Sequence, residues 1–237
     1  MHFTNLFTVA LLGASAVLAA PTAFSKMTNC NVSGIKLADR KVLITDPNNS
    51  TNALPPPTTA EGKLFKIALG VGTQNFSCAA AGSDPVSNGA YAILYDFSCI
   101  FLANEDAAKT LGDLAAQMKP DALNIFMKMT QNMLNVQYPI GKHFFKGDFT
   151  TPAFEFIDGQ KFYGGVAGKV PAPAGSYAGQ NGLGAVPSLK LTPKAGMGST
   201  ITTVYRIHTA GGVGPAKCDR PGIKQFPYSA EYWFYKA

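Results

Sequence analysis

The chain has 237 residues, of which 20 are Lys or Arg and 14 are Asp or Glu, so its formal net charge is +6. This length is ample for one domain with a core, and a hydrophobic content of 46% excludes a wholly disordered chain. The 24 glycines and 16 prolines favour turns and strands over a helical bundle. Basic residues are scattered rather than clustered, so we expect no nucleic-acid partner.

Residues 1–20 have the pattern of a secretory signal peptide. An apolar stretch from Leu6 to Leu18 ends in small residues, and we expect cleavage after Ala19 or Ala20. The stretch is too short to cross a bilayer comfortably, which argues against a membrane anchor. No later segment is long enough either, so the sequence predicts an extracellular protein without stable membrane insertion.

Four cysteines follow the expected cleavage site. In an oxidising compartment an even number predicts two disulfides, and three connectivities are open. No C-x-x-C pair exists, which argues against a zinc ribbon or a thioredoxin-like redox site, and we expect no metal. The four are Cys30, Cys78, Cys99 and Cys218.

Four N-x-S/T sequons predict a glycoprotein if the host is a eukaryote. Two of them lie in a Pro/Asn/Thr-rich segment that we expect to be exposed. Another lies in a predicted strand beside Cys78, where a glycan is sterically disfavoured. The sequons begin at Asn31, Asn48, Asn49 and Asn75.

The first half of the mature chain divides into an arm, strands and a helical insertion. Residues 21–61 predict an extended N-terminal arm with a polyproline stretch, and residues 62–237 predict a single β-rich domain. Residues 90–99 are apolar on both faces, as in a central strand. Residues 104–134 predict the insertion, in which Asn104 caps one helix and Pro120 begins a second.

Strand patterns return from residue 141 onward and are separated by Gly and Pro clusters. Alternation in one of them places Tyr205 and Ile207 opposite Arg206 and His208. The sequence therefore predicts a mainly β fold, a disulfide-stapled antiparallel β-sandwich or barrel with a small helical hairpin insertion. The segments are 151–157, 161–166, 186–192, 199–210 and 225–235.

Nucleotide-binding and nucleophile motifs are absent from the sequence. The G-x-G at residues 70–72 lacks the third glycine and leads into a strand rather than a helix. There is no Walker A loop and no G-x-S-x-G elbow. We therefore expect no cofactor.

One cluster of titratable residues resembles the smallest catalytic set of a glycoside hydrolase. His143, Glu155 and Asp158 lie close together in the sequence, and two carboxylates flanking a sugar bond are required for glycoside hydrolysis. However, Glu155 has an ordinary outward strand position, and Asp158 begins a hairpin turn. A buried, hydrogen-bonded role is likewise favoured for His143.

Trp233 and Tyr235 share one face of the last predicted strand. Aromatic rings on a sheet face can stack on sugars, so both are candidate ligand-binding residues. Packing in the core is the favoured role, since a sandwich buries half of its strand faces.

Several blocks resemble a secreted family of fungi and bacteria that is catalogued as domain of unknown function 3455. The blocks include LFKIALGVGTQNFSC, DGQKFYGGVAGKV, TVYRIHTAGGVGPAKC and FPYSAEYWFY, and the resemblance covers about residues 62–237. It implies secretion and a mainly β fold, but no established activity or catalytic residues. It also favours the pairs Cys78–Cys218 and Cys30–Cys99, because Cys78 and Cys218 lie in the blocks most like the family.

The resemblance bears on two further points. Family members often have Asn or Asp where this chain has His208, which implies that His208 is not a shared functional residue. Some fungal relatives bear the label malate dehydrogenase, and the missing dinucleotide motif and the signal peptide argue against an NAD-dependent dehydrogenase.

The leading functional hypothesis is a secreted, non-enzymatic fungal protein that acts at the cell wall or at a host surface, as an effector, an elicitor or a polysaccharide binder. Its expected partners are cell-wall or acidic polysaccharide, or a host surface protein. The alternative is a carbohydrate-active hydrolase or lyase that uses Glu155, Asp158 or His143.

Overall fold

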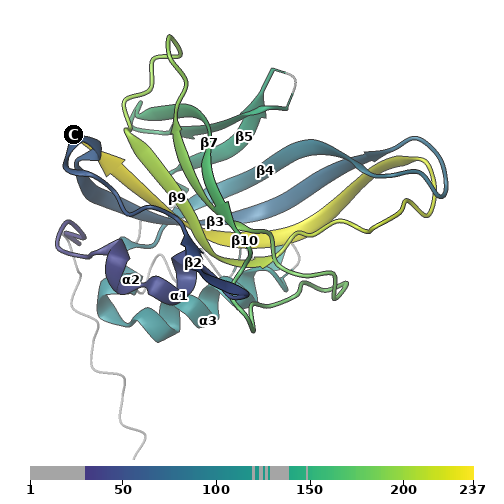
Figure 1. The fold of residues 1–237 in the computed structure, drawn as a ribbon, viewed down its shortest axis with the longest axis horizontal. Helices are drawn as coiled ribbons and strands as arrows, with labels where there is room; N and C mark the ends of the chain where they lie inside the picture. The colour runs from purple at the N-terminus through teal and green to yellow at the C-terminus, as the bar shows by residue number, and fades with distance from the viewer. Residues whose placement is uncertain (1–29, 119–120, 123–124, 126–127, 129–138, 148) are drawn as a thin grey trace, which may run out of the picture.

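Eight antiparallel strands form a closed barrel in the order β10-β3-β4-β5-β6-β7-β8-β9 (Figure 1). The computed structural model describes residues 30–118, 121–122, 125, 128, 139–147 and 149–237. The mainly β prediction is therefore confirmed, and of its two architectures the structure has the barrel. The strands are β3 (Lys63–Cys78), β4 (Val86–Asp96), β5 (Gly141–Lys146), β6 (Thr151–Phe156), β7 (Lys161–Val170), β8 (Ser188–Pro193), β9 (Thr203–Gly211) and β10 (Gly222–Lys236).

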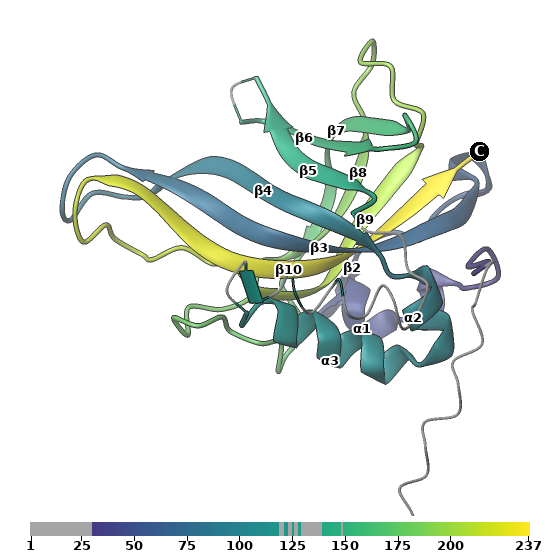
Figure 2. The same cartoon turned by 180° about the vertical axis from the view of Figure 1, so that it is seen from behind.

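Strands β3 and β10 are the longest of the barrel, with 16 and 15 residues. Strands β3, β4 and β10 extend beyond the rest of the barrel as a long projection (Figures 1 and 2). The pairing of β10 with β3 runs from Lys236 opposite Lys63 to Gly222 opposite Cys78. The tip of the projection is closed by a disulfide between Cys78 and Cys218.

The barrel interior is filled by aromatic side chains. Phe154 on β6 and Phe234 on β10 have ring centroids 5.4 Å apart although their strands are not neighbours, so the rings meet across the barrel. Gly70 on β3 lies against the ring of Tyr232, and a Cβ atom there would overlap that ring. An eight-stranded barrel has an interior just wide enough for such side chains.

A second core lies between the barrel and the helices on its outer surface. Figure 2 shows helices α2 (Ser98–Ala103) and α3 (Glu105–Ala115) beneath β3 and β10. Phe101 of α2 meets Trp233 of β10 edge to face, with ring centroids 5.3 Å apart. The strand segments that pack against the helices are therefore buried on both faces, and their side chains alternate between the two cores.

The N-terminal arm differs from the extended segment that the sequence predicts. Over residues 30–61 it folds into short elements, and four apolar side chains along it anchor it to the outer core. The Cys30–Cys99 disulfide also ties it to α2. The elements are η1 (Leu37–Asp39), α1 (Lys41–Ile44), β1 (Thr45–Asp46), β2 (Asn49–Ala53) and η2 (Thr59–Glu61), and the anchors are Val32, Leu37, Ile44 and Leu54.

The helical segment begins earlier than predicted. Strand β4 ends at Asp96, whose carboxylate accepts a hydrogen bond from the Ser98 amide and turns the chain into α2. Cys99 therefore lies on a helix rather than on the central strand expected for 90–99. Most of the second predicted helix, after Pro120, and the whole signal peptide fall outside the described residues.

The predicted cap of the first helix is present. The Asn104 side chain accepts a hydrogen bond of 3.0 Å from the Ala107 amide at the start of α3. We expect Asn104→Ala to lower the free energy of unfolding by about 1 kcal/mol, because it leaves that amide without its partner. Urea unfolding measures this. Thr110→Ala, on the exposed face of the same helix, is the control and should lose no stability, because Ala favours a helix more than Thr does. An equal loss in both variants would contradict the cap.

Candidate functional site

His143 lies inside the barrel. Its ring stacks on Phe154 with centroids 4.2 Å apart, and its Nδ1 atom donates to the Ala153 carbonyl at 2.9 Å. Burial lowers the pKa of His143 to about 3, so the ring is neutral at pH 7. The side chain is 2% exposed, which fits the buried, hydrogen-bonded role.

Glu155 lies on the outer surface of the barrel. It is opposite Lys142 on β5, next to the pair of His143 and Phe154, and successive side chains of a strand point to opposite faces. The Tyr163 hydroxyl donates to its Oε1 atom at 2.7 Å, and this bond, with the nearby Lys142 ammonium, lowers the pKa of Glu155 below its ordinary value.

Asp158 lies in the exposed turn between β6 and β7, where its carboxylate accepts hydrogen bonds from Gln160. The barrel wall therefore separates His143 from Glu155, and the three sequence candidates do not form one constellation. A hydrolase that combines them receives no geometric support.

The strands around Glu155 present a basic outer surface, which we call the basic strand face. Lys142 on β5 and Lys161 on β7 flank Glu155 in register, so one carboxylate lies in a row between two cations. The Lys146 ammonium lies 4.2 Å from the centroid of the Tyr163 ring. The face comprises the exposed residues Lys142, Lys146, Lys161 and Lys194, with Phe144, Tyr163 and Glu155 between them.

Trp233 and Tyr235 both lie in the outer core. Trp233 is fully buried under Phe101, and Tyr235 is 3% exposed. Neither ring presents a face to solvent, so in this structure both pack rather than stack on a sugar. Burial raises the pKa of Tyr235, which keeps its hydroxyl neutral.

The polar partner of Trp233 is a buried carboxylate. The indole Nε1 atom donates to Glu231 Oε2 at 3.0 Å, and the other oxygen, Oε1, lies 2.8 Å from Nδ1 of His208. Glu231 is 2% exposed. A carboxylate that receives two such bonds is held in one orientation.

His208 reaches Glu231 because the backbone of β9 is distorted. The pairing of β9 with β10 shifts between Ser229 and Glu231, and His208 has a φ of 48°. Regular alternation would place His208 on the same face as Arg206, inside the barrel, whereas the bulge turns it outward. A non-glycine residue in this conformation costs on the order of 1–3 kcal/mol, and such outliers concentrate at functional sites.

His208 and Glu231 line a pocket of about 530 Å³ between the arm, the helices and the barrel, which we call the arm pocket. Arg40 and Glu105 form an ion pair of 2.5 Å in its wall. The pocket joins segments that are far apart in the sequence. Its lining consists of residues 38–43, Phe101, Glu105, Asp106, Lys109, His208 and Glu231.

Sequence reasoning missed the placement of both His208 and Glu231 in this pocket. Alternation placed His208 on the wrong face because a bulge is not visible in a pattern of apolar and polar residues. Glu231 gave the clearer signal, since it is a lone carboxylate in the aromatic run QFPYSAEYWFY. A charge that is buried in a strand requires partners, and those partners define a site.

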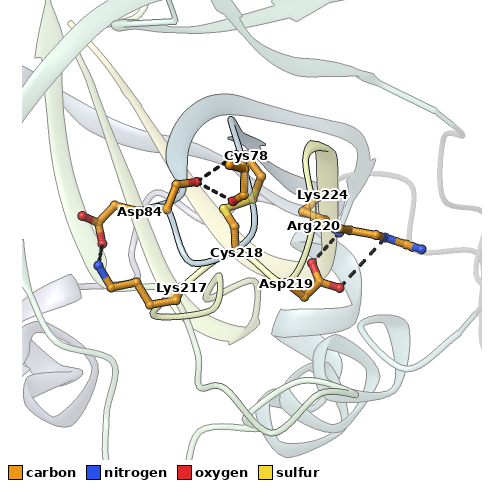
Figure 3. The surroundings of a disulfide bond; sticks show 9 residues. Cys78, Asp84, Lys217, Cys218, Asp219, Arg220 and Lys224 are labelled. Atoms are coloured by element: carbon orange, nitrogen blue, oxygen red, sulfur yellow. Dashed lines mark hydrogen bonds and ion pairs between the residues drawn. A yellow bond between two sulfur atoms is a disulfide. The ribbon is translucent and has the colours of Figure 1, made fainter.

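The cysteines and sequons occupy distinct surroundings. The two disulfides fit an oxidising compartment. Figure 3 shows the Cys78–Cys218 bond between two ion pairs, the exposed pair of Asp84 with Lys217 and the pair that Asp219 forms with its basic neighbours. Asn75 is half-buried and accepts hydrogen bonds from Thr73 and Gln225. The other sequon residues, Asn31, Asn48 and Asn49, are exposed.

Neither a metal site nor a membrane-spanning helix is found among the described residues. No group of three or more His, Cys, Asp or Glu side chains there is arranged to hold a metal ion. No helix in that part of the chain is long and apolar enough to cross a membrane.

Comparison with known proteins gives one match. A family model described as "Protein of unknown function (DUF3455)" matches residues 58–236. No curated protein and no solved structure matches the chain.

Proposed function

The chain belongs to the DUF3455 family, whose description states no function, and we propose that it is a secreted, non-enzymatic protein that binds acidic polysaccharide at a cell wall or host surface. The signal-peptide pattern and the two disulfides support secretion. The three exposed sequons fit a secreted glycoprotein of a fungal host.

The observation that carries the proposal is the basic strand face. Four exposed lysines lie on this face with the carboxylate of Glu155, which is already held by Lys142 and the Tyr163 hydroxyl. The cations on β5 and β7 are arranged by strand pairing, so their spacing is fixed by the barrel. A fixed row of cations on a rigid sheet complements a polymer that carries a carboxylate or sulfate on each sugar.

Apolar surface between the lysines supports a sugar polymer rather than a simple anion. Phe144 is half-buried, and the Lys142 ammonium lies 5.0 Å from the centroid of its ring. The aliphatic stems of the lysines add further apolar surface. The ring and the stems can contact the carbon faces of sugars while the ammonium groups pair with acidic substituents.

We expect the Lys142→Gln/Lys146→Gln variant to bind polygalacturonate at least tenfold more weakly than the wild type at low salt, because two of the four cations are lost. Co-sedimentation with the polymer at low and high salt measures this. Wild-type binding should fall steeply with salt, as expected for exposed charges, and no reducing ends should be released.

The control carries the same charge change elsewhere. Lys109→Gln/Lys217→Gln removes two exposed lysines that lie on α3 and beside Cys218. Equal weakening in both double variants would show a general effect of net charge and would contradict a specific face. Salt-resistant binding, or retention only by a protein receptor from a host surface, would also overturn the proposal.

A further inference from the structure

The arm pocket is distinct from the basic strand face. It is lined by the hydrogen-bonded side chains of Glu231 and His208, which polymer binding does not use. Glu231 accepts hydrogen bonds from Trp233 and from Nδ1 of His208. Because a carboxylate only accepts, the Nδ1 atom carries the proton of this bond. The pair therefore fixes the orientation of the imidazole ring and leaves the Nε2 atom as its free polar end.

That Nε2 atom has no hydrogen-bond partner among the described residues, although it is buried. An unpaired polar atom in a wall of the protein is costly unless another molecule satisfies it. In a neutral ring Nε2 accepts a hydrogen bond, and in a charged ring it donates one. A hydroxyl group matches either form, because it both donates and accepts.

The strained backbone at His208 points in the same direction. The bulge in β9 removes this side chain from the barrel interior, where alternation would place it, and brings it to the pocket. Glycine adopts a φ of this sign without steric cost, whereas a histidine does so only uncommonly. The presence of a histidine is therefore better explained by what its ring does in the pocket than by the needs of the turn.

The rest of the lining is balanced in charge. Besides the ion pair of Arg40 with Glu105, the pocket is lined by two acidic and two basic side chains that form no ion pair with another described residue. Val42 and Leu43 add apolar surface at the arm. Apart from the pair of Glu231 and His208, such a lining offers donors, acceptors and apolar contacts without favouring either sign of charge. The four charged side chains are Asp39, Lys41, Asp106 and Lys109.

We infer that the arm pocket binds a neutral, polyhydroxylated small molecule, the size of a mono- or disaccharide, with one ligand hydroxyl bonded to Nε2 of His208. The pocket volume of about 530 Å³ lies within the range of small-molecule sites. Its ligand class and location separate this site from the basic strand face.

The test uses the full mature protein with two neutral disaccharides, cellobiose and N,N′-diacetylchitobiose. We expect at least one to bind in calorimetry, to shift the His208 ring signals in NMR spectra, and to bind equally well in high salt. Glucuronate and glucosamine serve as acidic and basic probes. Tighter binding of either one than of the neutral sugars would overturn the inference, as would no shift of the His208 signals with both disaccharides.

Two variants separate this site from the basic strand face. His208→Asn keeps a side chain that tolerates the backbone conformation, and it should weaken disaccharide binding at least tenfold while the melting temperature stays within a few degrees. Lys142→Gln/Lys146→Gln should leave disaccharide binding unchanged even if polymer binding is lost. Unchanged disaccharide affinity in His208→Asn would overturn the inference, and the ring-signal measurement decides the question if that variant fails to fold.

Discussion

The wild-type protein should lose about 3 kcal/mol of stability between pH 6.5 and pH 4 because of His143, and the His143→Gln variant should lack this loss. Burial lowers the pKa of the folded histidine from its ordinary 6.5 to about 3, and the nearby Arg206 cation contributes to this shift. Between these two values the unfolded chain binds a proton that the folded chain does not. The wild-type free energy of unfolding therefore rises with pH in this window and is fully regained above pH 6.5.

Glutamine does not titrate, so its variant should lack this part of the acid sensitivity. At pH 7 it is expected to be less stable than the wild type by about 1–3 kcal/mol, since it loses the ring that stacks on Phe154. Guanidinium unfolding at pH 7, 6, 5 and 4 gives both numbers. The carboxylates Glu61 and Glu155, whose pKa values are lowered by their cationic and hydroxyl partners, titrate in both proteins and cancel in the comparison.

Glu155→Gln is the matched control, because it also replaces a titrating side chain on the same sheet. It lies outside the barrel and does not contact the ring of His143. The control should keep the wild-type slope between pH 6.5 and pH 5, where its own carboxyl group does not titrate. Parallel pH profiles for the wild type and His143→Gln would show that the buried ring takes up a proton in the folded state, contrary to this structure.

The strands were predictable because their burial pattern is local. The apolar segment 90–99 and the aromatic segment 225–235 read as strands in the sequence, and both form β-structure over most of their length. Closure was not predictable, because it depends on the pairing of β10 with β3 and β9, which joins residues that are more than a hundred positions apart in the first case. A sandwich and a barrel therefore have the same alternation in sequence.

The pocket was less predictable than the barrel. A single residue in the left-handed conformation, His208, reverses the face on which its side chain lies, and residue type alone does not reveal such a bulge. The arm was misjudged for a related reason, since Leu37 and Ile44 find their apolar partners only on the assembled barrel. The polar features of the arm pocket thus depend on the two parts of the chain with the weakest local signals.

Removing the Cys78–Cys218 disulfide should lower the free energy of unfolding by about 5 kcal/mol, the largest effect expected from any covalent change in this chain. The bond joins residues 140 positions apart, whereas Cys30–Cys99 joins residues 69 apart. Loop-closure entropy grows only with the logarithm of length, so Cys30→Ala/Cys99→Ala should cost nearly as much, about 4 kcal/mol. Double variants avoid leaving a free thiol.

The two double cysteine variants should nevertheless differ in which part of the native structure opens first. Cys78–Cys218 lies at the tip of the long projection, where the Gly82 amide donates to the Cys218 carbonyl and the Cys218 amide donates to the Ser83 carbonyl. These bonds and the ladder of β3 with β10 remain in Cys78→Ala/Cys218→Ala, so its native barrel should persist. Removal of Cys30–Cys99 instead releases the arm, and with it the residues that wall the arm pocket.

Hydrogen exchange and guanidinium unfolding distinguish these outcomes. Asp84→Asn is the control at the projection, since it breaks only an exposed ion pair with Lys217 and should change stability by less than about 1 kcal/mol. Cys30→Ala/Cys99→Ala should accelerate exchange over the arm and lose disaccharide binding, whereas Cys78→Ala/Cys218→Ala should keep that binding under conditions where it is folded. A loss of stability in Cys78→Ala/Cys218→Ala no greater than in Asp84→Asn would contradict the prediction. It would mean that the bond does not restrict the unfolded chain.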